Sequence, residues 1–256
     1  MGVTTPGRQV TAPGRGVKAA RPAGPGYRRD MAPLTLAHEL ALLGYDDAGV
    51  NRLGRPTLDY GLAGALLLEL ALAGRVEIAD GRLVVTDPAP VGQRQLDDAL
   101  TRIAADEKRR KPTDWISRLA KDLPEQVLDG LVTAGVLRRD SDKVLWVFPR
   151  TRYPSSTGAE PAVETQARQR MVAAVAGDGP VDGRTAALIG LARAVGLDRK
   201  LFAELPKEHV KRRLTEIAAG DWASAATRKA IEETQAAVLI ATTTATTAAI
   251  ITTTTS

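Results

Sequence analysis

Clusters of basic residues are the strongest chemical feature of this sequence. Residues 108–111 are four consecutive positive charges, Arg52 and Arg55 flank a glycine loop, and Arg118 and Lys121 are three residues apart. A spacing of three places two side chains on the same face of a helix. Arginine and lysine gathered near helix N-termini are the groups that phosphates bind. Each cluster is therefore a candidate anion site, with a solvated surface as the alternative.

Residues for other chemistry are scarce. The chain has no cysteine and only two histidines, His38 and His209, and it contains no GxxxxGK[ST] loop, no GxSxG and no strand-linked GxGxxG. His38 is interpreted as a boundary residue of an amphipathic helix and His209 as part of a solvated helix face. General acid–base catalysis needs a positioned group with a tuned pKa, and no pair of carboxylates is singled out by its spacing. We expect no enzyme, no metal site and no cofactor.

The positive charge is concentrated at the N-terminus. Residues 1–30 hold six basic residues and one acidic residue, so the remaining chain has 29 of each from totals of 35 and 30. The folded part is thus not the basic module that nucleic-acid binding favours, and aromatic residues for base stacking make up only 4%. Residues 1–32 are rich in glycine, proline and arginine without apolar periodicity, which predicts a disordered basic tail.

An apolar helix at about 58–73 is predicted to form the centre of the fold, because it is apolar on nearly every side. Its one internal charged residue, Glu69, is expected to be a buried carboxylate paired with a backbone amide or with Arg75. Gly74 ends the helix, residues 75–78 alternate as a strand, and Asp80-Gly81 is a hairpin turn signal.

The same order recurs further along the chain. A helix at 127–134 ends at Gly135, and we expect an outgoing strand at 136–139, a turn at 140–143 and a return strand at 144–148. Two such helix-then-hairpin units indicate duplicated winged-helix-like pieces.

Helical patterns account for most of the remaining chain. They lie at 36–43 with Thr35 as N-cap, at 95–103, from Thr113-Asp114 onward, and at 164–175, 185–195, 206–218 and 223–240. The last 21 residues carry no charge and include nine threonines, so they make a poor membrane span and are expected to fray into disorder. The expected fold is mainly α: a basic tail (1–32), a single helical domain around a buried central helix with two short β-hairpins (33–240), and a Thr/Ala-rich disordered tail (241–256).

The central stretch, Gly61 to Arg75, has the pattern GLxGxxLxELALxGR. Together with residues 36–43, Leu96-Asp97, Trp115-Ile116 and residues 131–137, it resembles the Golgi phosphoprotein 3 family over about residues 33–235. The resemblance implies a helical peripheral membrane adaptor that binds phosphatidylinositol 4-phosphate in a shallow basic pocket without catalysis. In eukaryotic relatives it also implies recruitment of Golgi cargo. The high alanine, arginine and glycine content indicates a bacterial member.

The family's pocket uses one tryptophan and three arginines. By the glycine landmarks these positions correspond to Gly54, Ala63, Lys121 and Pro124, of which Lys121 alone keeps a positive charge. Arg118, Arg52 and Arg55 could rebuild an anion site nearby. The candidate headgroup-binding residues are therefore Lys121, Arg118, Arg52 and Arg55.

In the family the second hairpin is an exposed apolar element that helps self-association. Here it corresponds to 144–148, where Trp146 and Phe148 would suit a partner or a membrane interface, unless the hairpin packs on its own domain. The expected partners are an anionic, phosphoinositide-like phospholipid and a possible second copy, with no nucleic acid. The expected location is cytoplasmic, at the inner face of the membrane. A winged-helix nucleic-acid binder and a ligand-free scaffold acting through this hairpin remain alternatives.

Overall fold

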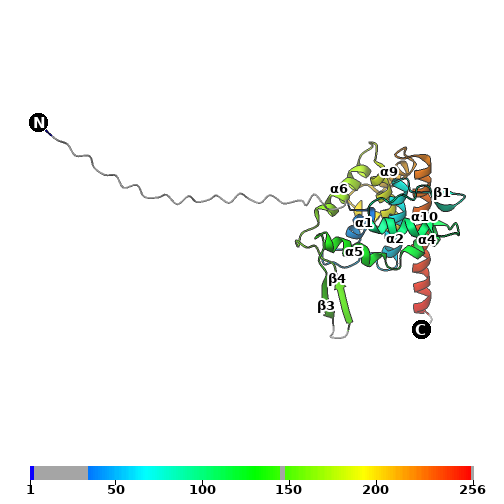
Figure 1. Ribbon diagram of the computed structural model, residues 1–256, viewed down its shortest axis with the longest axis horizontal. Coiled ribbons are helices and arrows are strands. Elements are labelled where there is room, and N and C mark those ends of the chain that lie inside the picture. Colours follow the sequence, from blue (N-terminus) through cyan, green and yellow to red (C-terminus); the bar gives the residue numbers. More distant parts are fainter. Residues whose placement is uncertain (3–33, 145–147, 255–256) are drawn as a thin grey trace. The chain divides into compact units, whose positions relative to one another are not determined.

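The computed structural model describes residues 1–2, 34–144 and 148–254, and the chain divides into two units, Met1–Met31 and Ala32–Ser256. The second unit is mainly helical. Its described residues form ten helices and two antiparallel two-stranded sheets (Figure 1). This confirms the expected fold class, a mainly α domain with two short hairpins.

The predicted helices are all present, and their ends differ by a few residues except for the last helix, which extends further than expected. The elements are α1 (Leu36–Gly44), α2 (Thr57–Leu72), β1 (Val76–Ala79), β2 (Arg82–Val85), α3 (Arg94–Ala104), α4 (Pro112–Leu119), α5 (Leu123–Thr133), β3 (Asp140–Val144), β4 (Phe148–Arg152), α6 (Ala162–Ala176), α7 (Gly183–Ala194), α8 (Asp198–Leu201), α9 (Lys207–Ala219) and α10 (Ala225–Thr254).

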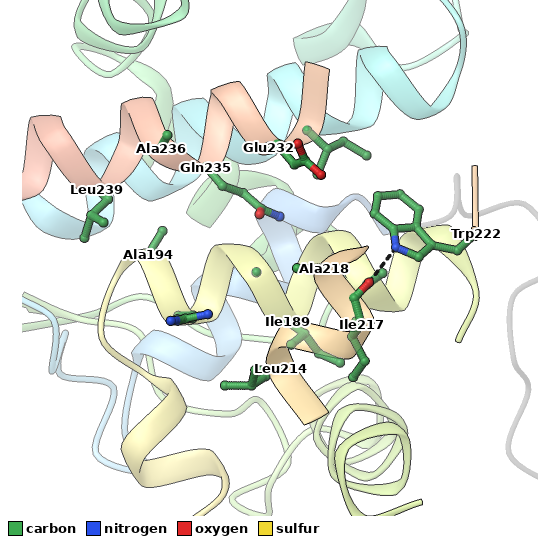
Figure 2. A pocket seen from close by; sticks show the side chains of 14 residues that line it. Ile189, Ala194, Leu214, Ile217, Ala218, Trp222, Glu232, Gln235, Ala236 and Leu239 are labelled. Atoms are coloured by element: carbon green, nitrogen blue, oxygen red, sulfur yellow. Dashed lines mark hydrogen bonds between the residues drawn. The ribbon is translucent and has the colours of Figure 1, made fainter. Parts of the chain in front are cut away.

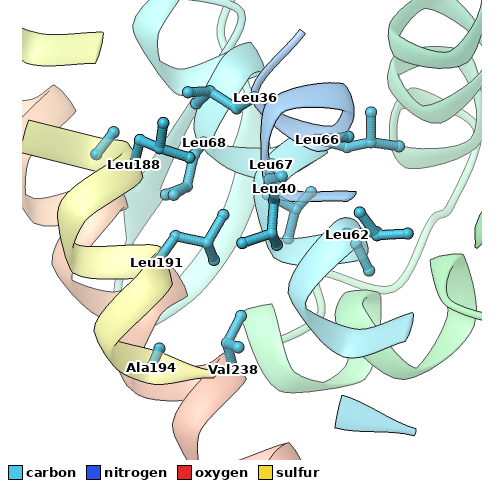
Figure 3. Packing of buried hydrophobic residues seen from close by; sticks show 14 of the residues in the cluster. Leu36, Leu40, Leu62, Leu66, Leu67, Leu68, Leu188, Leu191, Ala194 and Val238 are labelled. Carbon is cyan, nitrogen blue, oxygen red and sulfur yellow. The ribbon is translucent and has the colours of Figure 1, made fainter. Parts of the chain in front are cut away.

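Helix α2 lies at the centre, as its apolar sequence predicts. Helices α1, α3, α4, α5, α7 and α10 all pack against it. Leu62, Leu67 and Leu68 are fully buried among leucines of α1 and α7 and Val238 of α10 (Figure 3). Gly64 lets α10 approach closely, because a Cβ built on it would lie 2.3 Å from Cγ2 of Val238. Burial at this density makes the packing between helices the main source of stability.

The start of α1 is capped as predicted. Thr35 is the N-cap, its side-chain oxygen accepts a hydrogen bond from the backbone N–H of His38 at 3.4 Å, and Nδ1 of His38 accepts one from the N–H of Thr35 at 3.1 Å. His38 is buried, and burial lowers its pKa to about 4. A neutral imidazole in a reciprocal cap explains this histidine as structural.

Glu69 is held in the core by α1 and α7. Its Oε2 accepts from the N–H of Leu36 at 2.7 Å, and its Oε1 pairs with Nη1 of Arg184 at 2.5 Å. The predicted backbone partner is confirmed, but the expected ion pair with Arg75 is wrong. Arg75 pairs instead with Asp87, because the chain turns back after β2 and brings Asp87 alongside it.

Arg184 and Arg170 also bind a second buried carboxylate, Glu39 of α1. Nη2 of Arg184 lies 3.4 Å and Nη2 of Arg170 lies 3.0 Å from the Glu39 oxygens. The network ties α1, α2, α6 and α7 together, since each buried acid faces at least one guanidinium.

The first hairpin matches the prediction. Strands β1 and β2 pair antiparallel, and Asp80 and Gly81 both have positive φ, 52° and 67°, as a type I′ turn requires.

The second hairpin has a different register. The polar residues 140–143, expected as a turn, belong to β3, and the expected return strand 144–148 is wrong because β4 begins only at Phe148. Hydrogen bonds at the base set this register: the N–H of Arg138 donates to the carbonyl of Pro154 at 2.9 Å, and that of Ser156 to Val136 at 3.1 Å. Trp146 falls between the two strands, outside the described residues.

Helix α10 is longer than expected, running to Thr254 rather than ending near residue 240. The predicted disordered tail at 241–256 is therefore helical as far as Thr254. Two threonine hydroxyls bond to carbonyls of the same helix: Thr243 donates to the carbonyl of Leu239 at 2.7 Å and Thr247 to that of Thr243 at 3.0 Å. None of the described helices combines the length and apolar character needed to cross a membrane.

Candidate functional site

Arg52 and Arg55 lie in the loop that joins α1 to α2. Side chains within the loop fix its shape: Oδ1 of Asp46 accepts from the N–H of Val50 at 2.8 Å, and Oδ1 of Asn51 accepts from that of Leu53 at 2.9 Å. These short-range bonds are what place the two arginines just ahead of α2.

Both arginines are already paired with carboxylates. Arg52 pairs with Asp46, and Nε of Arg55 lies 3.2 Å from Oδ1 of Asp59, in the first turn of α2. Their side chains are 64% and 58% exposed. Burial raises the pKa of Asp59, and the charge of Arg55 opposes that shift. An incoming anion would compete with these local acids, so this loop is a weak anion site.

Arg118 and Lys121 lie at the end of α4. The helix stops at Leu119, so Lys121 sits in the turn before α5, and the prediction that the two share one helix face is wrong. Both residues are exposed, and within the described chain neither side chain forms an ion pair with a carboxylate. The charge of Arg118 helps to lower the pKa of Asp106, but no salt bridge joins the two among the described residues, so both cations are exposed to an external anion.

Arg102 of α3 is a third cation in this region, and sequence reasoning missed it. Its Nη2 donates to the carbonyl of Arg118 at 3.3 Å, and it too forms no carboxylate ion pair among the described residues. Arg102 also lines a hollow of about 380 Å³ between α3, α4 and α5. In the sequence, Arg102 could have been noticed only as a residue on the polar face of the strongly amphipathic α3. Its proximity to Arg118 arises only when the chain folds.

The hollow beside Arg102 is mixed in charge. Its polar lining includes Gln95, Asp98, Asp122 and Gln126, with Leu66 of α2 at its base. A phosphate here would contact Arg102 on one side and would be disfavoured by the two carboxylates on the other. The more favourable position for an anion is the exposed surface at the end of α4, where Arg102 contacts the carbonyl of Arg118 and Lys121 follows three residues further along the chain. We call these three residues the α4-end cation cluster.

The basic run at 108–111 is partly structural. Nε of Arg110 lies 2.6 Å from Oδ2 of Asp106, and that hydrogen bond is the main reason why the pKa of Asp106 is lowered. The carbonyl of Arg110 accepts from the N–H of Leu83 at 2.9 Å, which holds this loop against β2.

The four positions implied by the family resemblance differ in accessibility. Gly54 and Lys121 are exposed, whereas Ala63 and Pro124 are buried. Two of the four positions therefore cannot contact a headgroup in this structure. The four candidate cations come from two separate segments: Arg52 and Arg55 from the loop before α2, and Arg118 and Lys121 from the end of α4 and the turn after it.

The other titratable groups are accounted for by packing. Nε2 of His209 donates to the carbonyl of Val175 at 2.7 Å, and Nη2 of Arg212 lies 3.2 Å from its Nδ1. Burial raises the pKa of Glu164 to about 7, although Arg168 pairs with it at 2.6 Å and opposes the shift. None of these groups forms a catalytic arrangement with another in the part of the chain that the structure describes.

A buried apolar helix enclosed by helices, together with two hairpins, defines a mainly helical domain with exposed cations on its surface. The model of the Golgi phosphoprotein 3 (GPP34) family matches residues 36–234. The chain belongs to this family.

Two similar proteins are both named vacuolar protein sorting-associated protein 74. The one from Eremothecium gossypii is 30% identical over 146 residues, which cover 47% of this chain and 44% of that protein. The one from Schizosaccharomyces pombe is 26% identical over 173 residues, covering 57% and 50%. The chain thus spans about half the length of these relatives. Neither relative supports the expectation of a bacterial source, which stays a prediction.

Proposed function

We propose that this protein is a peripheral membrane adaptor that binds anionic phospholipid headgroups and catalyses no reaction. Family membership supports the adaptor role. The observation that carries the proposed binding is the α4-end cation cluster, in which Arg102, Arg118 and Lys121 are exposed and unpaired with carboxylates. Phosphate oxygens are strong acceptors for guanidinium and ammonium donors, and no internal ion pair has to be broken first.

Within this proposal Arg118 and Lys121 contribute most, and Arg52 and Arg55 contribute less. Asp46 and Asp59 offset the charge of the two loop arginines. The loop cations would add a long-range attraction that salt weakens, while the α4-end cation cluster would contact the headgroup directly.

The proposed headgroup is a phosphoinositide such as phosphatidylinositol 4-phosphate. A phosphomonoester carries more negative charge and more acceptor oxygens than a phosphodiester, so a cluster of three cations should prefer it. The proposed location follows from the lipid: the cytoplasmic, inner face of a membrane, where anionic lipids create a negative surface potential.

Vesicle flotation of the full-length chain tests the proposal. Vesicles would contain phosphatidylcholine alone, with phosphatidylserine, or with phosphatidylinositol 4-phosphate at matched charge. The variant Arg118→Gln with Lys121→Gln should bind the phosphoinositide vesicles roughly 30-fold more weakly, at about 1 kcal/mol for each charge near the surface. The matched control, Lys200→Gln with Lys207→Gln, removes two exposed charges on α8 and α9 and should retain binding within about threefold.

The basic N-terminal residues need their own control. A full-length variant with all six basic residues of 1–30 changed to glutamine should lose general attraction to phosphatidylserine but keep the preference for the phosphoinositide. Equal binding of both anionic vesicles by this variant, or an unchanged affinity after the Arg118 and Lys121 substitutions, would show that the α4-end cation cluster is not a headgroup site.

Self-association through residues 144–148 is also part of the proposal. Figure 1 shows β3 and β4 as a two-stranded arm extending from the helices near α5, which supports its use as a contact. Sedimentation velocity over a concentration series should show a dimer that Trp146→Asp abolishes. Nucleic acid is not proposed as a ligand, because α5, the helix before this hairpin, contains Glu125 and Asp129 and no basic residue.

A further inference from the structure

A groove separates α10 from α7 and α9, far along the chain from the α4-end cation cluster. Its volume is about 310 Å³, at the lower end of the range for small-molecule sites. The walls are mainly apolar, with Ile189 and Ala194 from α7, Leu214 and Ile217 from α9, and Ala236 and Leu239 from α10. Figure 2 shows these side chains directed into the space between the helices.

The two ends of the groove differ in charge. Ala194 and Leu239 lie at one end (Figure 2). Arg193, which precedes Ala194 on α7, also lines the groove. Trp222 and Glu232 lie at the other end. Glu232 and Leu239 are seven residues apart on α10, which corresponds to about 10 Å along the helix.

Neither charged residue of the groove is neutralised by its neighbours. Arg193 and Glu232 are both exposed, and across the described ranges neither forms an ion pair. The groove is therefore an apolar slot with a free cation at one end and a free carboxylate at the other.

The floor and the far end of the groove are fixed by hydrogen bonds. Nε2 of Gln235 donates to the carbonyl of Ala187 at 3.3 Å, and its side chain lies against Gly190, where a built Cβ would come within 2.2 Å of it. Nε1 of Trp222 donates to the carbonyl of Ile217 at 2.8 Å. The indole thus has no unsatisfied donor, and its ring can contact an alkyl chain.

The cation end also carries unusual apolar exposure. Leu239 and Ile240 are 53% and 57% exposed, and apart from Met1 they are the exposed large hydrophobic residues of the described chain. An apolar surface next to a free guanidinium suits the junction between the head and the tail of an amphiphile.

We propose that this groove binds a single-chain anionic amphiphile such as a fatty acid. Its carboxylate pairs with Arg193, and its alkyl chain follows the slot past Gln235 towards Trp222. Glu232 disfavours the reverse orientation, because it would face the carboxylate at the far end. This site is independent of the proposed headgroup-binding function, since it shares no residue with the α4-end cation cluster.

Isothermal titration calorimetry of the full-length chain with dodecanoate, below its micellar range, tests the proposal. We expect one saturable site. Octanoate should bind at least 100-fold more weakly, because each buried CH₂ contributes about fourfold. Dodecyltrimethylammonium, with the same chain and the opposite charge, should bind at least tenfold more weakly than dodecanoate.

Two variants with matched controls locate the site. Ala236→Trp fills the slot from an exposed helix position and should abolish dodecanoate binding, whereas Ala226→Trp, exposed on the same helix outside the groove, should not. Arg193→Gln should weaken binding about tenfold, while Arg199→Gln on α8 should leave it unchanged.

Three results would overturn the proposal: no saturable binding, equal affinity for the anionic and cationic chains, or binding that survives Ala236→Trp. Loss of dodecanoate binding in the Arg118→Gln, Lys121→Gln variant would also overturn it, by assigning the ligand to the other site. Circular dichroism of Ala236→Trp must match the parent spectrum. If it does not, Arg193→Gln, an exposed change, decides the outcome alone.

Discussion

Gly64 lies where α2 and α10 approach closely, so alanine at this position should force the two helices apart. A Cβ built here would lie 2.3 Å from Cγ2 of Val238 and 3.4 Å from Cδ1 of Leu191. Val238 is fully buried, so it cannot move out into solvent. Overpacking of this kind costs about 1–3 kcal/mol, while replacing a helical glycine by alanine returns about 1 kcal/mol of helix propensity. We expect Gly64→Ala to lower the free energy of unfolding by up to about 2 kcal/mol.

A double-mutant cycle separates the clash from other effects of Gly64→Ala. Val238→Ala alone should cost about 2 kcal/mol through the cavity it leaves. In the double variant the new methyl occupies that cavity, so the two losses should not add, and the coupling should reach about 1–2 kcal/mol. Urea unfolding followed by circular dichroism gives each value, with the slope unchanged. Gly179→Ala, where a Cβ has open space, is the control. Additive losses, or stabilisation by Gly64→Ala, would refute the close contact.

Two further predictions concern buried charges. Glu69→Gln should lower the free energy of unfolding by about 2 kcal/mol, because it leaves Arg184 and the amide of Leu36 poorly paired. Asp87→Asn breaks the more exposed ion pair with Arg75 and should lower it by less than about 1 kcal/mol. If urea unfolding gave similar losses of unfolding free energy for the two variants, the Glu69 network would not be the stronger interaction. The second prediction is a pH dependence at Glu164, because burial raises the pKa of this carboxyl from its ordinary value of 4.5 to about 7 in the fold. The folded state keeps this proton between those values, so stability should fall as pH rises from 4.5 to 7, by at most about 3 kcal/mol. Glu164→Gln should remove that loss, so the difference in unfolding free energy between variant and parent should shift in favour of the variant from pH 4.5 to pH 8. If the unfolding free energies of parent and Glu164→Gln changed in parallel with pH, the predicted role of Glu164 would be disproved. His38 contributes equally to parent and variant, so its effect cancels in this difference. Its lowered pKa of about 4 would by itself make stability decrease as pH drops below 6.5.

Local signals in the sequence were sufficient for much of the fold. The all-apolar character of α2 predicts a central buried helix, Thr35 predicts a cap, and Asp80-Gly81 predicts a type I′ turn, because each depends on residues within a few positions. The prediction for the second hairpin was wrong because its register depends on residues outside the turn itself. Its polar residues 140–143 look like a turn, but the register is set by pairing at its base, at Arg138 and Pro154.

The candidate site was less predictable because it depends on long-range contacts. The pairing of Glu69 with Arg184 spans 115 residues, and the approach of Arg102 to Arg118 joins two helices. Lys121 is an exposed cation, but the helix expected to carry it ends two residues earlier, at Leu119. Ion pairing in the fold also ranks the four candidate headgroup-binding cations, because nothing in the local sequence distinguishes Arg55, which is paired, from Arg118, which is not.

The sequence pattern from Gly61 to Arg75 can now be explained position by position. Gly61 and Gly64 allow close contact with Val195 and Val238, since a Cβ on either would come within 3 Å of them. Gly74 has a φ of 67°, which favours glycine where α2 gives way to β1. Glu69 and Arg75 bind partners on α1, α7 and the segment after β2.

All of these contacts are internal, so the lettered positions of the pattern describe the core, while Ala63, which the resemblance aligns with a pocket arginine, lies at one of its unlettered positions. Substitutions in it should change stability while leaving lipid preference intact in whatever fraction stays folded. Changes at Arg118 and Lys121, which are exposed and outside the pattern, should do the reverse. Members of one fold can therefore diverge in ligand without any change in this signature, because the cations that would contact a headgroup are not constrained by the packing of α2.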